Sequence, residues 1–337
     1  TEVLSDNAQW FEDNSPVDAR FKKKECKGVT AKVITTAILA GDCYPATPIG
    51  INLPNANWIR ETYGSKSVTI ENITYAYDQA AKGNGFKEEF VDCDADREMI
   101  EKYGYITDNI HTDLHECLGH GSGQLLPGVS QDALKAYGAT VEEARADLFG
   151  LYYSADPKMV ELGLLPTEDA YKAEYYTYLM NGLMTQLVRI NLGDQIEEAH
   201  MRNRALIAHW VYEKGAADKV VELEKRDGKT YVRINDYKKL RTLFGDLLAE
   251  IQRIKSEGDF EAARKLVENY GVNIDPELHK EVKERYAKLN ISPYKGFINP
   301  TYQLVEKDGK VVDVKVDYKE GYAEQMLRYS KMNNNVE

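Results

Sequence analysis

The stretch from His111 to His120, which reads His-Thr-Asp-Leu-His-Glu-Cys-Leu-Gly-His, restricts this chain more than any other. It places two imidazoles and a carboxylate within six residues, at His115, Glu116 and His120. A Zn²⁺ ion that performs hydrolysis needs neutral nitrogen ligands, a further protein ligand and one open position for water. It also needs a carboxylate that accepts a proton from that water. The two histidines can supply the nitrogens and Glu116 the carboxylate, so the stretch predicts a catalytic metal site.

The two histidines are five residues apart, one more than in the common His-Glu-x-x-His motif. Residues four apart differ by about 40° around an α-helix, whereas five residues rotate about 140° beyond a full turn. A regular helix would therefore aim the two rings apart. We expect a π-type turn that absorbs one residue, eased by Gly119, which carries no Cβ. On spacing alone the alternative stays open, namely two unrelated histidines on an ordinary helix with a solvated Glu116.

A second acidic cluster, Glu142-Glu-Ala-Arg-Ala-Asp147, lies in a predicted helix over residues 141–153. Glu143 and Asp147 are four apart and share a face, while Glu142 points to a neighbouring one. One carboxylate can bind the metal while the others accept hydrogen bonds from histidine N–H groups and so fix the ring tautomers. Taken alone, the cluster also fits a capped helix start with a salt bridge to Arg145.

Together the two motifs resemble those of the dipeptidyl peptidase III family of zinc aminopeptidases. That family's first motif, His-Glu-x-x-Gly-His, has the same five-residue spacing, and its second reads Glu-Glu-Cys-Arg-Ala-Glu/Asp. Here Ala144 stands where many relatives have cysteine. The resemblance implies one Zn²⁺ ion with the ligands His115, His120 and Glu143, the catalytic carboxylate Glu116, and the histidine partners Glu142 and Asp147.

A proline-rich segment, Pro45 to Asn55, cannot be regular helix because prolines interrupt it. Asn52 and Asn55 in this segment have an ordinary explanation as turn caps. The segment is also similar to Gly-Ile-Asn-x-Pro-Asn of the same family, whose asparagines hold the N-terminal part of the substrate. The resemblance therefore implies that both asparagines bind substrate.

Glu197 to Arg204 is predicted to be helical, with His200 and Arg204 one turn apart on the same face. Histidine and arginine on a helix commonly have only structural or solvated roles. The family has a similar Ala-His-Met-x-x-Arg segment in its cleft. That resemblance implies that His200 stabilises the charge of the tetrahedral intermediate and that Arg204 orients the peptide. Lys295 aligns loosely with a basic cleft residue of the family, although a lysine in such a place is commonly solvated.

The periodicity of the chain predicts a mainly α protein with a smaller β part. Apolar residues recur at three and four over residues 140–214, which is typical of helices. Two hairpins are predicted, turning at Arg226-Asp-Gly228 and Lys307-Asp-Gly309. Residues 67–77 have a strand-like first half, and we expect a helix to follow through the alanines after Tyr77. We expect the amphipathic helices of residues 237–289 to form outer scaffold.

The family's enzymes are longer and two-lobed, with a cleft between a helical zinc-binding lobe and a lobe built around a β-barrel. By resemblance, residues 1–27 and 73–293 belong to the helical catalytic lobe. Residues 28–72 and 294–337 are expected to contribute to the second, β-containing lobe, whose remainder is absent from this chain. The missing N-terminal part of the same enzyme is then a partner of this fragment, and zinc binding should survive its loss better than activity.

Charge and cysteine usage narrow the functional classes. A net charge of −12 over 337 residues argues against nucleic acid as a partner, because phosphate neutralisation needs a basic face. The sequence shows no long apolar stretch that would cross a membrane. The four cysteines are scattered without a C-x-x-C pair, which favours free thiols, a reducing compartment and a cytoplasmic location.

The hypothesis that combines these features is that the chain belongs to a zinc-dependent exopeptidase that releases dipeptides from the N-terminus of oligopeptides. One alternative is a different zinc hydrolase, such as an esterase or a carboxypeptidase. Another is a non-catalytic peptide-binding protein with a structural zinc, which would need four protein ligands. Three convincing ligands beside a carboxylate base favour catalysis.

Overall fold

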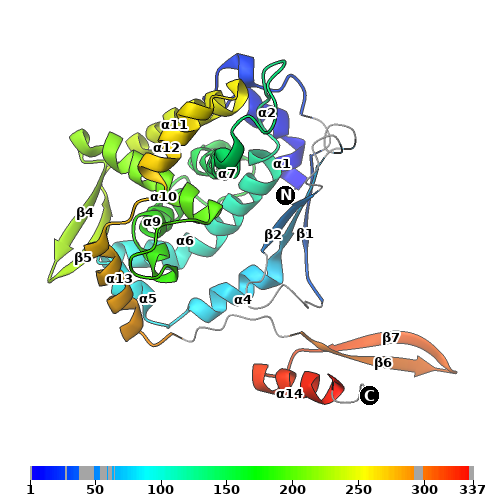
Figure 1. Ribbon diagram of the computed structural model, residues 1–337. Helices are drawn as coiled ribbons and strands as arrows, with labels where there is room; N and C mark the ends of the chain where they lie inside the picture. The colour runs from blue at the N-terminus through cyan, green and yellow to red at the C-terminus, as the bar shows by residue number, and fades with distance from the viewer. Residues whose placement is uncertain are drawn as a thin grey trace. The chain divides into compact units, whose positions relative to one another are not determined.

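The computed structural model describes residues 2–26, 29–37, 49–53, 59, 63, 65–291 and 299–333. Helices dominate it and the sheets are small (Figure 1), so the predicted mainly helical fold with a smaller β part is confirmed. The helices are α1 (Glu2–Asp6), α2 (Ala8–Asp13), α4 (Glu71–Ala81), α5 (Phe86–Phe90), α6 (Asp94–Asp113), α7 (Gly138–Ser154), α8 (Lys158–Glu161), α9 (Tyr171–Leu183), α10 (Ala199–Lys214), α11 (Tyr237–Glu257), α12 (Phe260–Tyr270), α13 (Pro276–Lys288) and α14 (Tyr322–Asn333). Shorter helical turns are η1 (Ala19–Phe21), η3 (Leu114–Gly119), η4 (Lys135–Tyr137), η5 (Thr185–Arg189) and η6 (Ala216–Asp218). The strands are β1 (Val29–Ile34), β2 (Gly50–Leu53), β3 (Ser65–Ile70), β4 (Val221–Arg226), β5 (Lys229–Ile234), β6 (Thr301–Lys307) and β7 (Lys310–Asp317).

The chain divides into two compact units. The larger comprises residues 1–32, 50–69 and 83–291, and the smaller comprises residues 33–49, 70–82 and 292–337. The core of the larger unit surrounds α7, which packs against η3, α6, α10 and α11. A helix that is buried on most of its sides needs apolar residues on more than one face, and α7 has them beside its charged stretch from Glu142 to Asp147. Its buried apolar side chains include Val141, Leu148, Phe149 and Leu151.

The helix α11 corrects the expectation that residues 237–289 form outer scaffold. It packs along α7, and its apolar face is fully buried in the main core. The reason is that apolar residues recur every three or four positions along the helix, so they form one continuous apolar face. Its buried apolar residues are Leu240, Phe244, Leu247, Leu248, Ile251 and Ile254.

The predicted π-type turn at the histidine motif is confirmed. The α-helix α6 continues into η3, a π-helix, and the backbone N–H of His120 donates to the carbonyl of His115 at 3.0 Å. This hydrogen bond spans five residues, which is the π pattern. Gly119 is also needed for the packing of η3 on another helix. A Cβ added there would lie 2.8 Å from Cα of Ala146 and 2.9 Å from its carbonyl oxygen, so the glycine lets η3 touch the backbone of α7.

The structure contains the two predicted hairpins and a three-stranded sheet that the sequence did not predict. β1, β3 and β2 form a sheet in that order, and β2 pairs with β3 antiparallel, with Asn52 opposite Ser67. β3 leads directly into α4, so the predicted strand followed by a helix is found, but the helix begins at Glu71 rather than after Tyr77. The hairpins β4–β5 and β6–β7 turn at the two predicted Asp-Gly pairs, where both residues of each pair have positive φ. Positive φ at both central positions is the requirement that Asp-Gly meets in a two-residue turn.

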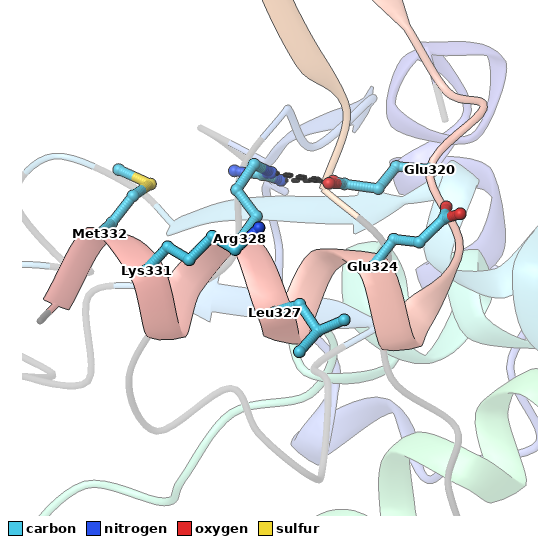
Figure 2. Close-up of a pocket in the computed structure, with 6 residues that line it drawn as sticks. All are labelled: Glu320, Glu324, Leu327, Arg328, Lys331 and Met332. Atoms are coloured by element: carbon cyan, nitrogen blue, oxygen red, sulfur yellow. Dashed lines mark hydrogen bonds and ion pairs between the residues drawn. The ribbon is translucent and has the colours of Figure 1, made fainter.

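The smaller unit exposes many apolar side chains for its size. α14 packs through Gln325, which accepts a hydrogen bond from the backbone of Asn299 at 2.5 Å. Figure 2 shows Arg328 of α14 paired with Glu320 at 2.7 Å, with Leu327 pointing away from that pair. The hairpin β6–β7 leaves Tyr302, Leu304, Val311, Val312, Val314 and Val316 exposed. Among the described residues, no helix combines the length and the apolar composition that crossing a membrane requires.

We predict that Gly119→Ala destabilises the chain by about 1–3 kcal/mol, because its Cβ overpacks against the α7 backbone. Gly138→Ala is the matched control, since the nearest atom to its Cβ is 3.8 Å away and it begins a helix. The control should be neutral or gain up to about 1 kcal/mol. Urea unfolding of the metal-free chains measures both, and equal midpoints for the two variants would contradict the close-packing argument.

Candidate metal centre

The π-helix η3 and the helix α7 bring His115, His120 and Glu143 together. Oε2 of Glu143 lies 3.2 Å from Nε2 of His115 and 3.8 Å from Nε2 of His120. The two rings are 4.7 Å apart between centroids and nearly perpendicular. One ligand atom from each of the three residues lies within 4.8 Å of the others.

These donors fit a zinc ion. Oε2 of Glu143 is buried and accepts no hydrogen bond, although a buried carboxylate oxygen normally has a partner. Two imidazole nitrogens and a carboxylate oxygen are the ligand types that Zn²⁺ takes in catalytic sites with three protein ligands. The orphaned oxygen between the two rings is therefore where a cation would be stabilised.

Asp147 supports the ring of His115. Nδ1 of His115 donates to Oδ1 of Asp147 at 2.6 Å, which leaves Nε2 facing Glu143. Burial disfavours the charged imidazolium, but the carboxylates of Asp147 and Glu143 outweigh it and raise the pKa of His115 to about 10. Burial alone would raise the pKa of Asp147, yet its bonds with His111 and His115 hold it well below its usual range. The site therefore strongly favours positive charge.

Glu142 supports the ring of His120 in the same way. Nδ1 of His120 donates to Oε1 of Glu142 at 2.8 Å. The same carboxylate accepts two hydrogen bonds from Arg145, at 2.7 and 3.0 Å, and pairs with Lys255 of α11. Burial acts against ionisation of Glu142, but Arg145 and Lys255 hold its pKa well below the usual range. The predicted salt bridge to Arg145 and the histidine contact therefore exist together.

Glu116 follows His115 on η3 and lies beside the strand β2. A Cβ added to Gly50 would lie 3.0 Å from Oε1 of Glu116, so the backbone of β2 approaches this carboxylate closely. Thr69 of the paired strand β3 donates to Asp113 at 2.8 Å, one residue before η3 begins. This hydrogen bond holds β3, and with it β2, next to the histidine motif.

Of the other predicted site residues, the structure describes the side chains of His200 and Arg204 only. Nδ1 of His200 lies 3.4 Å from Oε2 of Glu143, and the His200 side chain is about half exposed at 53%. Its position follows from Glu198, whose carboxylate caps the start of α10. Arg204, one turn further, is half-buried. The side chain of Asn52, and the residues Asn55 and Lys295, lie outside the described part of the chain.

Arg204 acts electrostatically on two buried acids of α9. Burial raises the pKa of Glu174 to about 8, and the charges of His111 and Arg204 oppose that rise. Burial likewise raises the pKa of Tyr178 well above its usual value, and Arg204 again acts in the opposite direction. The structure thus brings His200 to the candidate metal centre. The charge of Arg204 acts instead on the buried side chains of Glu174 and Tyr178.

Sequence reasoning missed Tyr178, Asn203 and Lys255. Tyr178 and Asn203 donate to Oδ2 of Asp147 at 2.7 and 3.0 Å, and Lys255 contacts Glu142. All three come from helices far along the chain, so no local spacing could have identified them. His111 carried a signal, because it lies four residues before His115 and shares its helical face.

Fold and donor set together define a mainly helical protein with a candidate metal-binding site. The family model "Peptidase family M49" matches residues 4–135 and 129–327. The chain therefore belongs to peptidase family M49, which supports a peptidase and hence a hydrolase.

Curated relatives agree with this family. The chain is 26% identical to dipeptidyl peptidase 3 of Mus musculus, over 77% of this chain and 41% of the relative. It is 25% identical to dipeptidyl peptidase 3 of Homo sapiens, over 82% of this chain and 43% of the relative. It is also 26% identical to Nudix hydrolase 3 of Arabidopsis thaliana, over 90% of this chain and 37% of the relative.

Solved structures agree in fold. The structure of DPP III from Caldithrix abyssi matches with a TM-score of 0.68 and 25% identity, over 86% of this chain and 52% of that one. The dipeptidyl-peptidase III of Corallococcus sp. strain EGB has the same TM-score at 24% identity. The chain spans about half the length of these structures, and less than half of the curated relatives above.

We predict that Glu143→Ala weakens zinc binding by at least ~100-fold, because it removes a ligand rather than a supporting partner. Glu161→Ala is the matched control, since Glu161 is an exposed glutamate of α8. Elemental analysis and competition with a chelator measure the zinc. Undiminished zinc in Glu143→Ala would remove Glu143 from the ligand set.

Proposed function

We propose that this chain is the catalytic part of a zinc-dependent exopeptidase that releases dipeptides from the N-terminus of oligopeptides. The observation that carries the proposal is the orphaned Oε2 of Glu143 between His115 and His120. Membership of peptidase family M49 and the relatives named dipeptidyl peptidase 3 support it. The converging donors come from three of the described residues, which supports a catalytic rather than a structural zinc.

Glu116 acts as the general base of the proposed reaction. A Zn²⁺ ion, when held by His115, His120 and Glu143, supplies Lewis acidity that polarises the scissile carbonyl and makes water more acidic. Glu116 accepts the proton of the attacking water and passes it to the leaving amine. His200, beside Glu143, donates to the oxygen that becomes negative in the tetrahedral intermediate. Arg204, on the same helix, orients the peptide.

The strand β2 offers a place for the substrate. It is the end strand of its sheet among the described residues, and its Gly50 adjoins Glu116. An extended peptide that lies along such an edge is held by backbone hydrogen bonds. Asn52, two residues further along β2, and Asn55 then hold the substrate's free amine, and Lys295 contributes positive charge to the cleft.

We also propose that residues 28–72 and 294–337 belong to a second lobe that needs further chain to complete it. The exposed apolar side chains of β6–β7 support this, because exposed apolar patches commonly mark interaction surfaces. The missing N-terminal part of the enzyme is the proposed partner, and oligopeptides are the proposed substrates.

Glu116→Gln should keep fold and zinc content and lower kcat on dipeptidyl-arylamides by about 10²–10⁴-fold, because the amide cannot accept the proton. The assay is best made in the intact enzyme. Glu161→Gln, an exposed change on α8, serves as the control. Wild-type turnover by Glu116→Gln would exclude Glu116 as the base.

The 337-residue chain alone should bind zinc yet release dipeptides slowly or not at all. Neutral amides accept hydrogen bonds from an ammonium but do not neutralise it, so a further acidic partner is needed in the absent part. Restoring that part should lower KM and raise kcat, since positioning and binding return together.

In the intact enzyme, the double change Asn52→Ala with Asn55→Ala should weaken dipeptide release and leave zinc content unchanged. The paired measurements are steady-state kinetics and zinc analysis. An intact double mutant indistinguishable from wild type, or full dipeptidyl-peptidase activity from the 337-residue chain alone, would count against this placement.

A further inference from the structure

Two buried polar residues behind the candidate metal centre have no part in the proposed reaction. His111 of α6 and Glu174 of α9 are only 8% and 4% exposed. Nδ1 of His111 lies 3.7 Å from Oε1 of Glu174. On its other side, Nε2 of His111 lies 3.3 Å from Oδ1 of Asp147, the same oxygen that accepts from His115. A line of side chains therefore runs from Glu174 through His111 and Asp147 to His115.

The two carboxylates that support the histidine ligands are anchored in different ways. Glu142 is paired with the cations Arg145 and Lys255. Asp147 is buried. Its contacts in the described part of the chain include no arginine or lysine. Its partners besides His115 are a tyrosine, an asparagine and His111. Tyr178 and Asn203 contact Oδ2 of Asp147, so His111 is the partner that shares Oδ1 with His115.

The hydrogen-bond roles of these rings are restricted by Asp147. For Nε2 of His115 to bind a metal, its Nδ1 must carry the proton that it donates to Oδ1 of Asp147. For the same oxygen to accept from His111, Nε2 of His111 must also carry a proton. Nδ1 of His111 then faces Glu174, with no hydrogen-bond partner of its own. Glu174 is thus the carboxyl that lies on the side of the ring away from Asp147.

The backbone of α7 is adapted to the His111 ring. A Cβ added to Gly150 would lie 2.9 Å from Nδ1 and 3.0 Å from Cε1 of His111. Real Cβ atoms rarely come that close to a ring, so any larger residue would displace it. A glycine in mid-helix costs about 0.5–1 kcal/mol relative to alanine. Here the glycine makes room for the His111 ring next to Asp147.

We propose that His111, backed by Glu174 and accommodated by Gly150, is a positioning residue that fixes Asp147 and through it the metal-binding ring of His115. The proposal rests on the proposed function, since it assumes that His115 binds zinc. His111 touches neither substrate nor reacting atoms. His111 instead restricts the orientation of the His115 ring and determines which of its ring nitrogens is free to bind the metal.

The test compares two substitutions of His111 in the 337-residue chain. His111→Gln keeps an N–H donor near the position of Nε2, whereas His111→Met fills a similar volume without one. Zinc affinity is measured by competition with a chelator, and stability by urea unfolding of the metal-free proteins. We expect His111→Met to weaken zinc binding by ~10–100-fold and His111→Gln to recover most of that loss.

A buried histidine elsewhere separates positioning from packing. His279 of α13 is 2% exposed and contacts the carbonyls of Leu187 and Ile190 at 3.1 Å. His279→Met should lower stability and leave zinc affinity unchanged. With Co²⁺ in place of zinc, His111→Met should also shift the visible absorption bands, because the ligand field at His115 changes, whereas His279→Met should not.

Gly150→Ala provides a second route if His111→Met does not fold. It retains His111 but displaces its ring, so it should also weaken zinc binding. Equal zinc affinity in wild type, His111→Met and Gly150→Ala, or equal losses in His111→Met and His111→Gln, would overturn the proposal while the zinc site stands. Failure of the wild-type chain to bind zinc would overturn the proposed function together with it.

Discussion

The structure of the candidate site depends on the close contact between η3 and α7 at Gly119. The π turn shifts His120 by one residue, so that its ring meets that of His115 instead of pointing away. Contact with the backbone of Ala146 then brings η3 against the helix that carries Glu142, Glu143 and Asp147. Without the π turn the histidines diverge, and without the glycine the acidic helix stands too far away. Both features are needed before any ligand set can form.

The site is supported in layers whose electrostatics differ between the two histidines. His120 is held by a carboxylate that is paired with Arg145 and Lys255. His115 is held by Asp147, whose further partners are His111, Tyr178 and Asn203. A carboxylate already paired with an arginine and a lysine is a weaker acceptor than one whose contacts include neither. The two imidazoles are therefore expected to differ as ligands although both come from one motif.

Much of this arrangement could be predicted from the sequence because it is local. The spacing of His115 and His120 predicts the π turn, and the four-residue spacing of Glu143 and Asp147 predicts their shared face. The Asp-Gly turns predict the two hairpins. Contacts made by Tyr178, Asn203 and Lys255 could not be predicted, since they depend on how α9, α10 and α11 pack around α7. The contact of Gly119 with α7 was missed for the same reason, because it concerns another helix.

The central claim is that one zinc ion binds where His115, His120 and Glu143 converge. Anomalous X-ray diffraction at the zinc absorption edge, from crystals of the chain grown with one equivalent of zinc, tests it most directly. We predict a single strong anomalous peak within bonding distance of Nε2 of both histidines and Oε2 of Glu143. A peak at other residues, or none at these three atoms while the crystals contain zinc, would contradict it.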